Sequence, residues 1–358
     1  MNERISFDNS EIIVSQTAEN ELSNSINSMA YSKIFILVDE NTHVHCLTKF
    51  LKNFPTELPI EVIEIPAGEE NKTITTCVQV WESLADLKAD RNSVLINLGG
   101  GVVTDLGGFI ASTYRRGIDF FHFPTSLLAM VDAAIGGKNG VDLGSLKNQV
   151  GVIQFPTKVY VNTTYLNTLP PKEMKSGLAE MLKHGLIKDL AYWEKFEQMH
   201  QMNISALDEL ILESIQIKYS IVQKDPNENG LRKTLNFGHT LGHAIESHFL
   251  NHPQKYLLHG EAIAVGMILA SFLSVQLNQF SENDLSRISA LIGKYFTKIE
   301  FTSKDISQII ELTKFDKKNF GNQVNFVLLD QIGKCKIDCQ VPESLINDAF
   351  NYYDSLKL

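Results

Sequence analysis

The sequence predicts an α/β N-terminal domain with a Rossmann-like parallel sheet, followed by a mainly α-helical C-terminal domain. Three observations predict this fold class. The chain has 358 residues, and a domain usually contains about 100–200 residues. In the first half, short apolar segments alternate with segments of helical spacing, which is typical of a parallel sheet. In the second half, apolar residues recur at three- and four-residue steps, which is typical of helices.

Short apolar segments in the first half are expected to form strands, because each is followed by turn-forming or polar residues. They are residues 33–39, 60–65, 94–98, 119–123 and 158–162. A helix is expected at residues 75–89, where Val78, Trp81 and Leu84 recur at helical spacing. Strands separated by helical segments favour parallel pairing.

Long segments of helical spacing dominate the second half. They are residues 172–202, 204–223, 234–249 and 259–278. Residues 324–329 and 335–341 alternate in polarity around Ile332-Gly333, which predicts a hairpin.

The domain boundary is expected at Leu169-Pro170-Pro171. Proline disfavours helix in the preceding residue and suits a first helical turn. The division is therefore 1–169 and 170–358. The apolar run 262–275 is shorter than the roughly 20 residues of a membrane span, so we expect a buried core helix there.

Composition excludes some partners. The 32 basic and 42 acidic residues give a formal charge of −10, which disfavours nucleic acid and anionic membranes. Residues 1–5 are charged and lack the apolar stretch of a secretion signal. The few scattered cysteines predict free thiols in the cytoplasm rather than a disulfide framework. They are Cys46, Cys77, Cys335 and Cys339.

A glycine cluster, residues 99–101, follows the third strand and opens a helix. Glycines let backbone N–H groups approach a phosphate, and a helix N-terminus favours negative charge. The usual dinucleotide fingerprint is absent, because Thr104 stands where its third glycine would be. A tight turn without a ligand is the alternative. Asp39 ends the first strand, where an acid could bind a ribose hydroxyl.

His239 and His243 lie four residues apart, on one face of a predicted helix. That spacing can supply a metal pair, and a polar helix face is the alternative. His259 begins another helix, and Glu180 lies within one. A carboxylate with two imidazoles and an open position is a known catalytic zinc arrangement. The residues alone leave open which two histidines join which acid. Gly136-Gly137-Lys138 suits an anion site or a plain turn.

Several segments, in order along most of the chain, resemble the 3-dehydroquinate synthases of the sugar-phosphate cyclase family. They are residues 66–72, 99–105, 113–117, 124–138, 176–183, 230–246 and 259–267. The wider superfamily, with glycerol dehydrogenase and metal-dependent alcohol dehydrogenases, shares the glycine turn and a three-ligand metal site.

The resemblance implies a set of site residues, matched position by position. A divalent metal, zinc or cobalt, would be bound by Glu180, His239 and His259. NAD would be held by Asp39, Glu69, Lys72, Gly100, Gly101, Val102, Asp105, Thr125 and Ser126, with Lys138, Lys147 and Thr168 nearby. The substrate pocket would be lined by Asp132, Lys138, Lys147, Asn148, Lys183, Lys218, Arg232, Asn236 and His243.

Further residues are implied outside these sets. Arg116 would reach the substrate phosphate of the neighbouring subunit in a homodimer. A further lysine of the family matches Lys317 or Lys318. The chain departs from the usual pattern at Ala133-Ala134, where serines are common, and at Asp142, where asparagine is frequent. Thr125-Ser126 stands where two threonines are common, and the hydroxyl is kept.

The resemblance also implies a reaction, in a cleft between the two domains. The substrate is 3-deoxy-D-arabino-heptulosonate 7-phosphate, and the products are 3-dehydroquinate and phosphate. The steps are transient oxidation by NAD, β-elimination of phosphate, re-reduction, ring opening and an internal aldol closure. This carbon–oxygen lyase belongs to the shikimate pathway, which leads to chorismate and aromatic amino acids.

Three other functions are compatible with parts of the sequence. Another sugar-phosphate cyclase, making a deoxy-inosose or valiolone ring, would share the metal ligands. An NAD- and metal-dependent polyol dehydrogenase would need the ligands and the glycine turn but not the lysines and arginines. A non-catalytic scaffold would need none of them.

Overall fold

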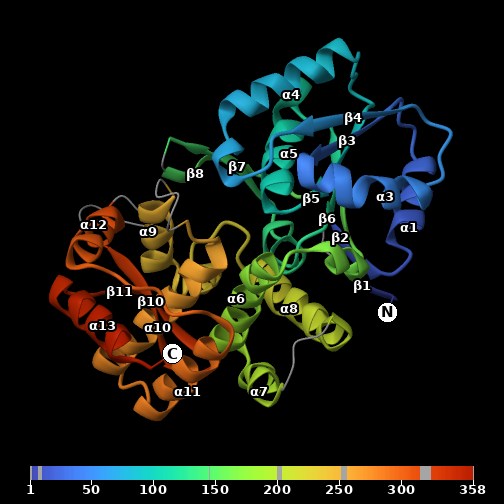
Figure 1. The fold of residues 1–358 in the computed structure, drawn as a ribbon. Coiled ribbons are helices and arrows are strands. Elements are labelled where there is room, and N and C mark those ends of the chain that lie inside the picture. The colour runs from blue at the N-terminus through green and yellow to red at the C-terminus, as the bar shows by residue number, and fades with distance from the viewer. Residues whose placement is uncertain are drawn as a thin grey trace. The chain divides into compact units, whose positions relative to one another are not determined.

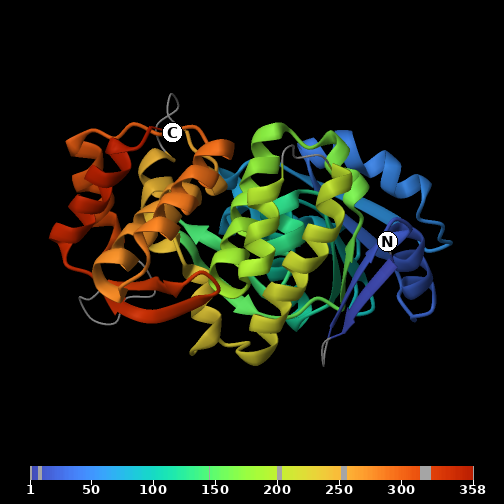
Figure 2. The ribbon, with the colours of Figure 1, turned by 90° about the horizontal axis from the view of Figure 1, so that it is seen from below.

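The computed structural model describes residues 2–6, 10–144, 146–199, 204–250, 256–314 and 324–357. The chain forms two compact units (Figures 1 and 2). The first comprises Met1–Pro170 and Asn203–Tyr219, and the second comprises Pro171–Met202 and Ser220–Leu358. Residues 203–219 therefore group with the first unit, although they follow the expected boundary in the sequence.

A seven-stranded sheet forms the centre of the first unit. Its strands are β1 (Asn2–Ser6), β2 (Glu11–Ser15), β3 (Ile34–Asp39), β4 (Ile60–Ile65), β5 (Val94–Gly99), β6 (Asp119–Pro124) and β9 (Lys158–Val161). The order is β1-β2-β9-β6-β5-β3-β4, and only β1 pairs antiparallel. The expected parallel sheet is confirmed. β1 and β2 were not predicted. β1 is a largely exposed edge strand without apolar alternation, whereas β2 is a short apolar run that is buried.

The strand order places a topological switch point between β3 and β5. The chain runs from β3 to β4 on one side and then returns to β5 on the other side of β3. In open α/β sheets, ligands bind beyond the carboxyl ends of the strands at such a point. Asp39 ends β3 and Gly99 ends β5. Both features that predicted a nucleotide therefore stand at the switch point.

Helices cover this sheet and complete the core of the first unit (Figure 1). The apolar side chains of Leu37, Leu95, Val103 and Leu106 join β3 and β5 to helix α5 in one buried cluster. The helical segments are α1 (Ala18–Asn27), α2 (Glu40–Thr42), η1 (His43–Leu47), α3 (Thr48–Lys52), η2 (Glu69–Asn71), α4 (Ile74–Asp86), α5 (Gly101–Thr113), η3 (Tyr114–Arg116), η4 (Ala129–Ala133) and η5 (Thr163–Thr168).

His122 on β6 is buried inside the first unit, with 1% of its surface exposed. Its Nδ1 lies 3.1 Å from the side-chain nitrogen of Asn97. Burial lowers the pKa of His122 to about 3, because the charged imidazolium is poorly solvated there. The folded protein therefore keeps this histidine neutral over the range in which an unfolded chain protonates it.

We expect the free energy of unfolding to fall as the pH falls below about 6.5. Below that pH the unfolded state binds a proton on His122, whereas the folded state binds it only near pH 3. The free energy of unfolding should therefore be lower at pH 5 by ~2 kcal/mol. Urea unfolding at pH 6.5 and pH 5 measures it. A His122→Gln variant lacks the titrating group and should show a smaller decline; an equal decline would contradict the assignment to His122.

A two-stranded hairpin, β7 (Lys138–Leu143) and β8 (Leu146–Ile153), follows η4. The sequence suggested only a glycine–lysine turn here, and strands were not expected. β8 is largely exposed along its length and carries polar residues and a glycine, so it lacks the alternation of a half-buried strand. The hairpin is held by β7, which packs against α5.

The second unit is mainly helical, as expected, around the buried helix α10. Its elements are α6 (Pro171–Lys188), α7 (Leu190–Gln198), η6 (Leu231–Asn236), α9 (His239–Phe249), α10 (His259–Asn278), α11 (Glu282–Tyr295), α12 (Ser303–Thr313), β10 (Asn325–Gln331), β11 (Lys334–Gln340) and α13 (Glu343–Ser355). α8 (Ile204–Lys224) begins in the first unit and ends in the second. β10 and β11 form the expected hairpin.

α10 is long and apolar enough to cross a membrane, but 72% of its apolar window is buried within the protein. It packs against α6, α9, α11, α13 and β10. The expected core helix is confirmed.

Two helix boundaries differ from the expectation. The segment predicted to be mostly helical over 172–202 breaks at Asp189, whose side chain accepts the Tyr192 N–H and starts α7. Residues 200–202 lie outside the described part. The helix expected from residue 234 starts at His239 instead, because Gly238 adopts φ +76° before it. Both helix boundaries are set by the residue just before the helix. Such a residue does not change the spacing of the apolar residues, so the spacing did not predict either boundary.

Candidate functional site

Three side chains of the second unit bring potential metal-ligand atoms together. Glu180 lies on α6, His239 begins α9 and His259 begins α10. Their ligand atoms lie within 4.8 Å of one another. One carboxylate oxygen of Glu180 is 3.5 Å from Nε2 of His239 and 3.3 Å from Nε2 of His259. A divalent ion between these three donors would have the ligand types of a catalytic zinc site.

Close packing of α6 against the start of α10 positions two of these ligands. A Cβ atom on Gly260 would lie 2.3 Å from Cα of Ser176, so only glycine allows this approach. The Gly260 N–H donates to the Ser176 hydroxyl at 3.0 Å. Ser176 lies one helical turn before Glu180, which therefore faces His259.

Charge in the cluster is balanced within the second unit. Lys183, 1% exposed, donates to the fully buried Glu180 carboxylate. Burial lowers the pKa of His259, but the carboxylates of Glu246 and Glu180 outweigh burial and raise it to about 9. An ion bound here must displace that proton, because a histidine ligand is neutral.

α9 contributes two further residues to this cluster. The ring of His243 lies 4.9 Å from that of His239 and 5.8 Å from that of His259, measured between centroids. Glu246 places a carboxylate oxygen 3.2 Å from Nδ1 of His259. No role was expected for Glu246. Its position seven residues after His239 puts it on the same helix face and could have indicated one.

Arg232 and Asn236, two expected substrate ligands, lie on η6 in the second unit. The carboxylate of Asp225 accepts backbone N–H groups of residues 229, 230 and 232, which fixes the loop before η6. Arg232 is 2% exposed and donates to the Pro226 carbonyl at 2.6 Å. Asn236 donates to Glu228 at 2.8 Å. Lys317 and Lys318 lie outside the described residues.

Four of the expected NAD ligands cluster in the first unit. The Lys72 ammonium is 3.0 Å from Glu69 and 3.3 Å from Asp105, and Lys147 is 3.1 Å from Glu69. Burial lowers the pKa of Lys72, but Glu69, Asp105 and Asp142 outweigh it and raise the pKa above its usual range. Burial raises the pKa of Asp105 to about 6, although Lys72 opposes this.

The glycine cluster forms the turn from β5 into α5. A Cβ atom on Gly99 would lie 2.6 Å from the Val103 side chain, so packing requires glycine there. At Gly100 the nearest atom would be the Ser126 hydroxyl at 3.3 Å, and at Gly101 it would be Cβ of Ala133 at 3.4 Å. The protein's own atoms therefore leave space at Gly100 and Gly101.

Other expected NAD ligands lie around this turn. The Thr125 N–H donates to the Gly99 carbonyl at 2.9 Å, which holds the end of β6 beside the turn. The Asp39 carboxylate accepts the Thr42 N–H at 2.7 Å and caps α2, a role that the sequence analysis did not foresee. The Thr168 hydroxyl donates to the Tyr165 carbonyl at 3.2 Å, and Val102 is the second residue of α5.

The remaining expected substrate ligands of the first unit lie on α8, η4, the β7–β8 hairpin and η3. Lys218 on α8 lies 2.6 Å from the Asp132 carboxylate on η4. The Asn148 N–H donates to Asp142 at 2.6 Å, and Asn148 has φ +51°. Lys138 begins β7. Arg116 is exposed and has φ +70°.

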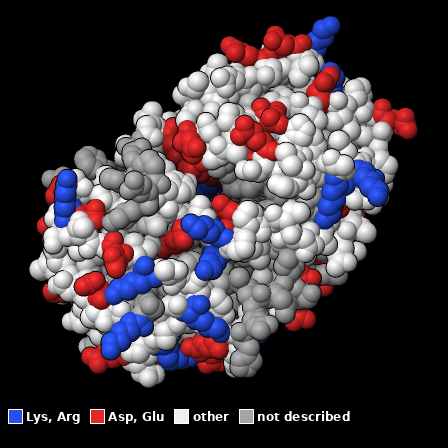
Figure 3. Space-filling view, in the orientation of Figure 1, with Lys and Arg blue, Asp and Glu red and all other residues white. Residues whose placement is uncertain are grey.

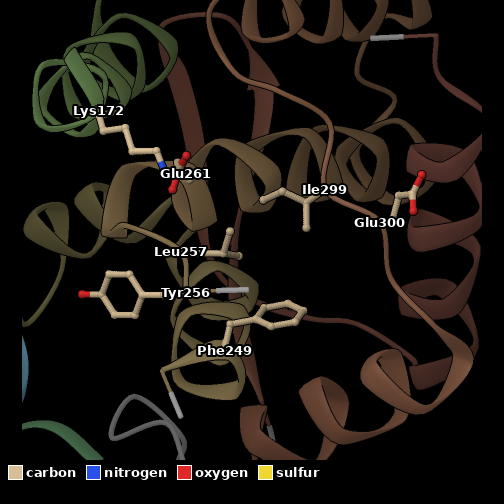
Figure 4. A pocket seen from close by; sticks show the side chains of 7 residues that line it. All are labelled: Lys172, Phe249, Tyr256, Leu257, Glu261, Ile299 and Glu300. Atoms are coloured by element: carbon tan, nitrogen blue, oxygen red, sulfur yellow. The ribbon is translucent and has the colours of Figure 1, made fainter. Parts of the chain in front are cut away.

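A pocket of about 340 Å³ lies elsewhere in the second unit (Figure 4). Phe249, Leu257 and Ile299 face its interior, and the Lys172 ammonium points toward the Glu261 carboxylate. None of the three candidate metal ligands lines it. On the face shown in Figure 3, Lys and Arg are interspersed with Asp and Glu rather than gathered into one basic surface.

The doubly wound sheet of the first unit and the helical second unit belong to a fold class whose solved members include a 2-deoxy-scyllo-inosose synthase and, at lower identity, a glycerol dehydrogenase. A solved 2-deoxy-scyllo-inosose synthase, in complex with carbaglucose-6-phosphate, NAD+ and Co2+, has a TM-score of 0.85 and 26% identity, covering 98% of this chain and 100% of that one. A glycerol dehydrogenase from Schizosaccharomyces pombe, at 15% identity and TM-score 0.65, covering 99% of this chain and 91% of that one, shares the fold.

Sequence comparison narrows the class to one family. Residues 62–176 match the model "3-dehydroquinate synthase N-terminal" and residues 177–319 match "3-dehydroquinate synthase C-terminal". A 3-dehydroquinate synthase from Parabacteroides distasonis is 38% identical over 345 residues, 96% of this chain and 97% of that protein. The chain belongs to the 3-dehydroquinate synthase family and is an enzyme.

Proposed function

We propose that the enzyme converts 3-deoxy-D-arabino-heptulosonate 7-phosphate to 3-dehydroquinate and phosphate, using NAD and one divalent metal ion, zinc or cobalt. One observation carries the proposal: the set of Glu180, His239 and His259, of which the first two are buried, in a chain of this family. The proposal places the enzyme in the cytoplasm and in the shikimate pathway, which leads to chorismate.

The reaction is an internal redox cycle followed by a ring exchange. C5 would give hydride to NAD while the C5 hydroxyl gives up its proton. The resulting ketone acidifies the neighbouring C6–H, so phosphate can leave by β-elimination. Hydride returns to C5, so NAD is regenerated, and ring opening with aldol closure gives the product. A bound divalent ion supplies Lewis acidity that lowers the pKa of the C5 hydroxyl and orients it.

Cationic side chains of this chain match the charges of the substrate. Lys183 and Arg232 are buried in the second unit, where either can pair with a carboxylate or phosphate. Lys218 is held in place by Asp132 in the first unit. His243, beside two proposed metal ligands, is suited to relay a proton in the later steps. A buried cation is favoured by an anionic ligand, because each offsets the poor solvation of the other.

The turn from β5 into α5 suits the pyrophosphate of NAD. It lies at the switch point of the sheet, and α5 presents its N-terminal N–H groups and positive dipole end there. The space at Gly100 and Gly101 lets a phosphate approach the backbone. This favours a ligand site over a plain tight turn.

Two glycine variants should separate the two roles of this helix. A methyl group at Gly101 meets its nearest atom at 3.4 Å, so Gly101→Ala should keep the fold and weaken NAD binding about tenfold or more by blocking the phosphate approach. At Gly107 it would lie 1.9 Å from Oδ1 of Asn97, so Gly107→Ala should cost about 1–3 kcal/mol of stability. Calorimetric titration with NAD and urea unfolding measure both, and unchanged NAD affinity in Gly101→Ala would contradict the site.

The decisive assay supplies the heptulosonate phosphate with zinc and NAD far below the substrate concentration. Phosphate and 3-dehydroquinate should accumulate over many turnovers per NAD, without net NADH. Steady NADH formation from a simple diol, with no phosphate release, would instead indicate a polyol dehydrogenase. Turnover of a hexose 6-phosphate in place of the heptulosonate would indicate another sugar-phosphate cyclase.

A homodimer is part of this proposal, with Arg116 acting on the neighbouring subunit's substrate phosphate. Arg115 and Arg116 both adopt positive φ, at +50° and +70°, which is strained for residues other than glycine. Such strain is common at functional sites, and Arg116 is exposed.

Mixing two inactive variants tests this contact. Consider a dimer of one Arg116→Ala subunit and one Glu180→Ala subunit. The Arg116→Ala subunit keeps its metal ligands and receives Arg116 from its neighbour, so one of the two sites is complete. Random mixing makes half of the dimers mixed, so activity should recover to about a quarter of wild type. Refolding the two variants together and assaying phosphate release measures it. No recovery in a verified mixed dimer would place Arg116 outside the neighbour's site.

A further inference from the structure

We infer that Glu246 is a positioning residue for the metal site, which holds the imidazole of His259 so that Nε2 faces the ion. This inference deepens the proposed metal set and rests on it. Glu246 lies on α9, is 5% exposed and has its carboxylate beside the His259 ring. Its action is on the ligand and not on the reacting atoms.

The two ring nitrogens of His259 face two different carboxylates. Nδ1 lies 3.2 Å from Oε2 of Glu246, and Nε2 lies 3.3 Å from Oε1 of Glu180. A carboxylate beside Nδ1 keeps the ring proton on that nitrogen, because the N–H then donates to a charged acceptor. When an ion displaces the other proton, the lone pair is therefore the one on Nε2, the nitrogen directed at Glu180.

The second histidine of the set is oriented in the same way by a neutral group. Nδ1 of His239 lies 3.0 Å from the Phe237 carbonyl, and its Nε2 lies 3.5 Å from Glu180. Both imidazoles therefore turn Nε2 toward the same carboxylate oxygen and have an acceptor behind Nδ1. The partners differ, since only Glu246 adds a negative charge.

That charge has an electrostatic consequence. Glu180 and Glu246 together bring two negative charges to the cluster, and Lys183 offsets one of them in the metal-free protein. A carboxylate hydrogen-bonded to a ligand histidine raises the basicity of that ligand, and loss of such a partner typically weakens metal binding about 10–100-fold. Glu246 should therefore contribute to affinity through both orientation and charge.

Zinc affinity of the metal-free protein, measured by competition with a chromogenic chelator, tests the inference without any assay of turnover. Glu246→Ala should bind zinc about 10–100-fold more weakly. Glu246→Gln should lose less, because its amide oxygen still accepts from Nδ1 while the charge is gone. The visible spectrum of the Co2+ form should change most in Glu246→Ala, since the ligand ring is no longer held.

Asp305→Asn is the matched control. Asp305 lies 2.9 Å from Nε2 of His248, so it also pairs a carboxylate with a buried imidazole of α9, but with no candidate ligand. A structural effect of losing such a pair would appear in this variant too, as a lower melting temperature of the metal-free protein, while zinc affinity should stay at the wild-type value.

The outcomes separate this inference from the proposed metal set. Wild-type zinc affinity and cobalt spectrum in a folded Glu246→Ala variant would overturn the inference and leave the metal set standing. Equal weakening in Asp305→Asn would also overturn it. Unchanged zinc binding in Glu180→Ala would overturn the metal set itself, and the role of Glu246 with it.

Discussion

Replacement of Glu180 by alanine is expected to abolish metal retention and turnover together. One carboxylate oxygen of Glu180 lies near Nε2 of both ligand imidazoles, at 3.5 Å from His239 and 3.3 Å from His259. Without it, two histidines remain as donors, and the cation of Lys183 is left buried where the ion would bind. Metal Lewis acidity is worth several kcal/mol, and a loss of ~4 kcal/mol corresponds to a roughly 10³-fold lower kcat.

Metal content after dialysis and the rate of phosphate release measure the two effects. Glu173→Ala, which removes another carboxylate from the first turn of α6, is the control and should keep both properties. Excess zinc should restore some activity to Glu180→Ala if two ligands still hold the ion weakly. An alanine variant that retains stoichiometric metal and full activity would refute the assignment of Glu180.

The elements that the sequence predicts well are those whose burial leaves a periodic signal. β3, β4 and β5 are apolar runs between turn residues, and α10 spans residues 259–278 as expected, because its apolar side chains are buried over nearly its whole length. β1 and β8 were missed because both are largely exposed, so their pairing leaves no alternation in the sequence. β2 was missed although it is buried, because its apolar run is only three residues long. The break at Asp189 was missed because a side-chain cap does not alter the helical period.

The candidate site shows the same limit at the level of side chains. Spacing alone offered His239 with His243 as a pair, but the structure turns Nε2 of His239 and of His259, twenty residues later, toward Glu180. The packing of α6, α9 and α10 decides which ligand atoms come together. That packing leaves no periodic pattern in a single sequence. Glu246 and the cap at Asp39 were also missed. Their hydrogen-bond partners depend on the folded geometry of the side chains, which residue spacing does not reveal.

Replacement of Lys183 by methionine is expected to destabilise the metal-free protein by about 3–5 kcal/mol, because it leaves the buried Glu180 carboxylate without its cation. Methionine has a similar length and stays apolar, so the change is mainly one of charge. Lys188→Met, at the exposed end of α6, is the control and should change stability by no more than about 0.5 kcal/mol.

The metal-loaded protein should lose much less stability than the metal-free protein. A divalent ion bound by Glu180 supplies the positive charge that the variant lacks, so the ion and Lys183 partly substitute for each other in neutralising one carboxylate. Turnover should nevertheless fall, because the ion cannot replace an ammonium group that pairs with the substrate. Urea unfolding with and without zinc, beside the phosphate assay, measures the three effects. Equal destabilisation in both forms would show that packing of the lysine stem, rather than its charge, stabilises α6.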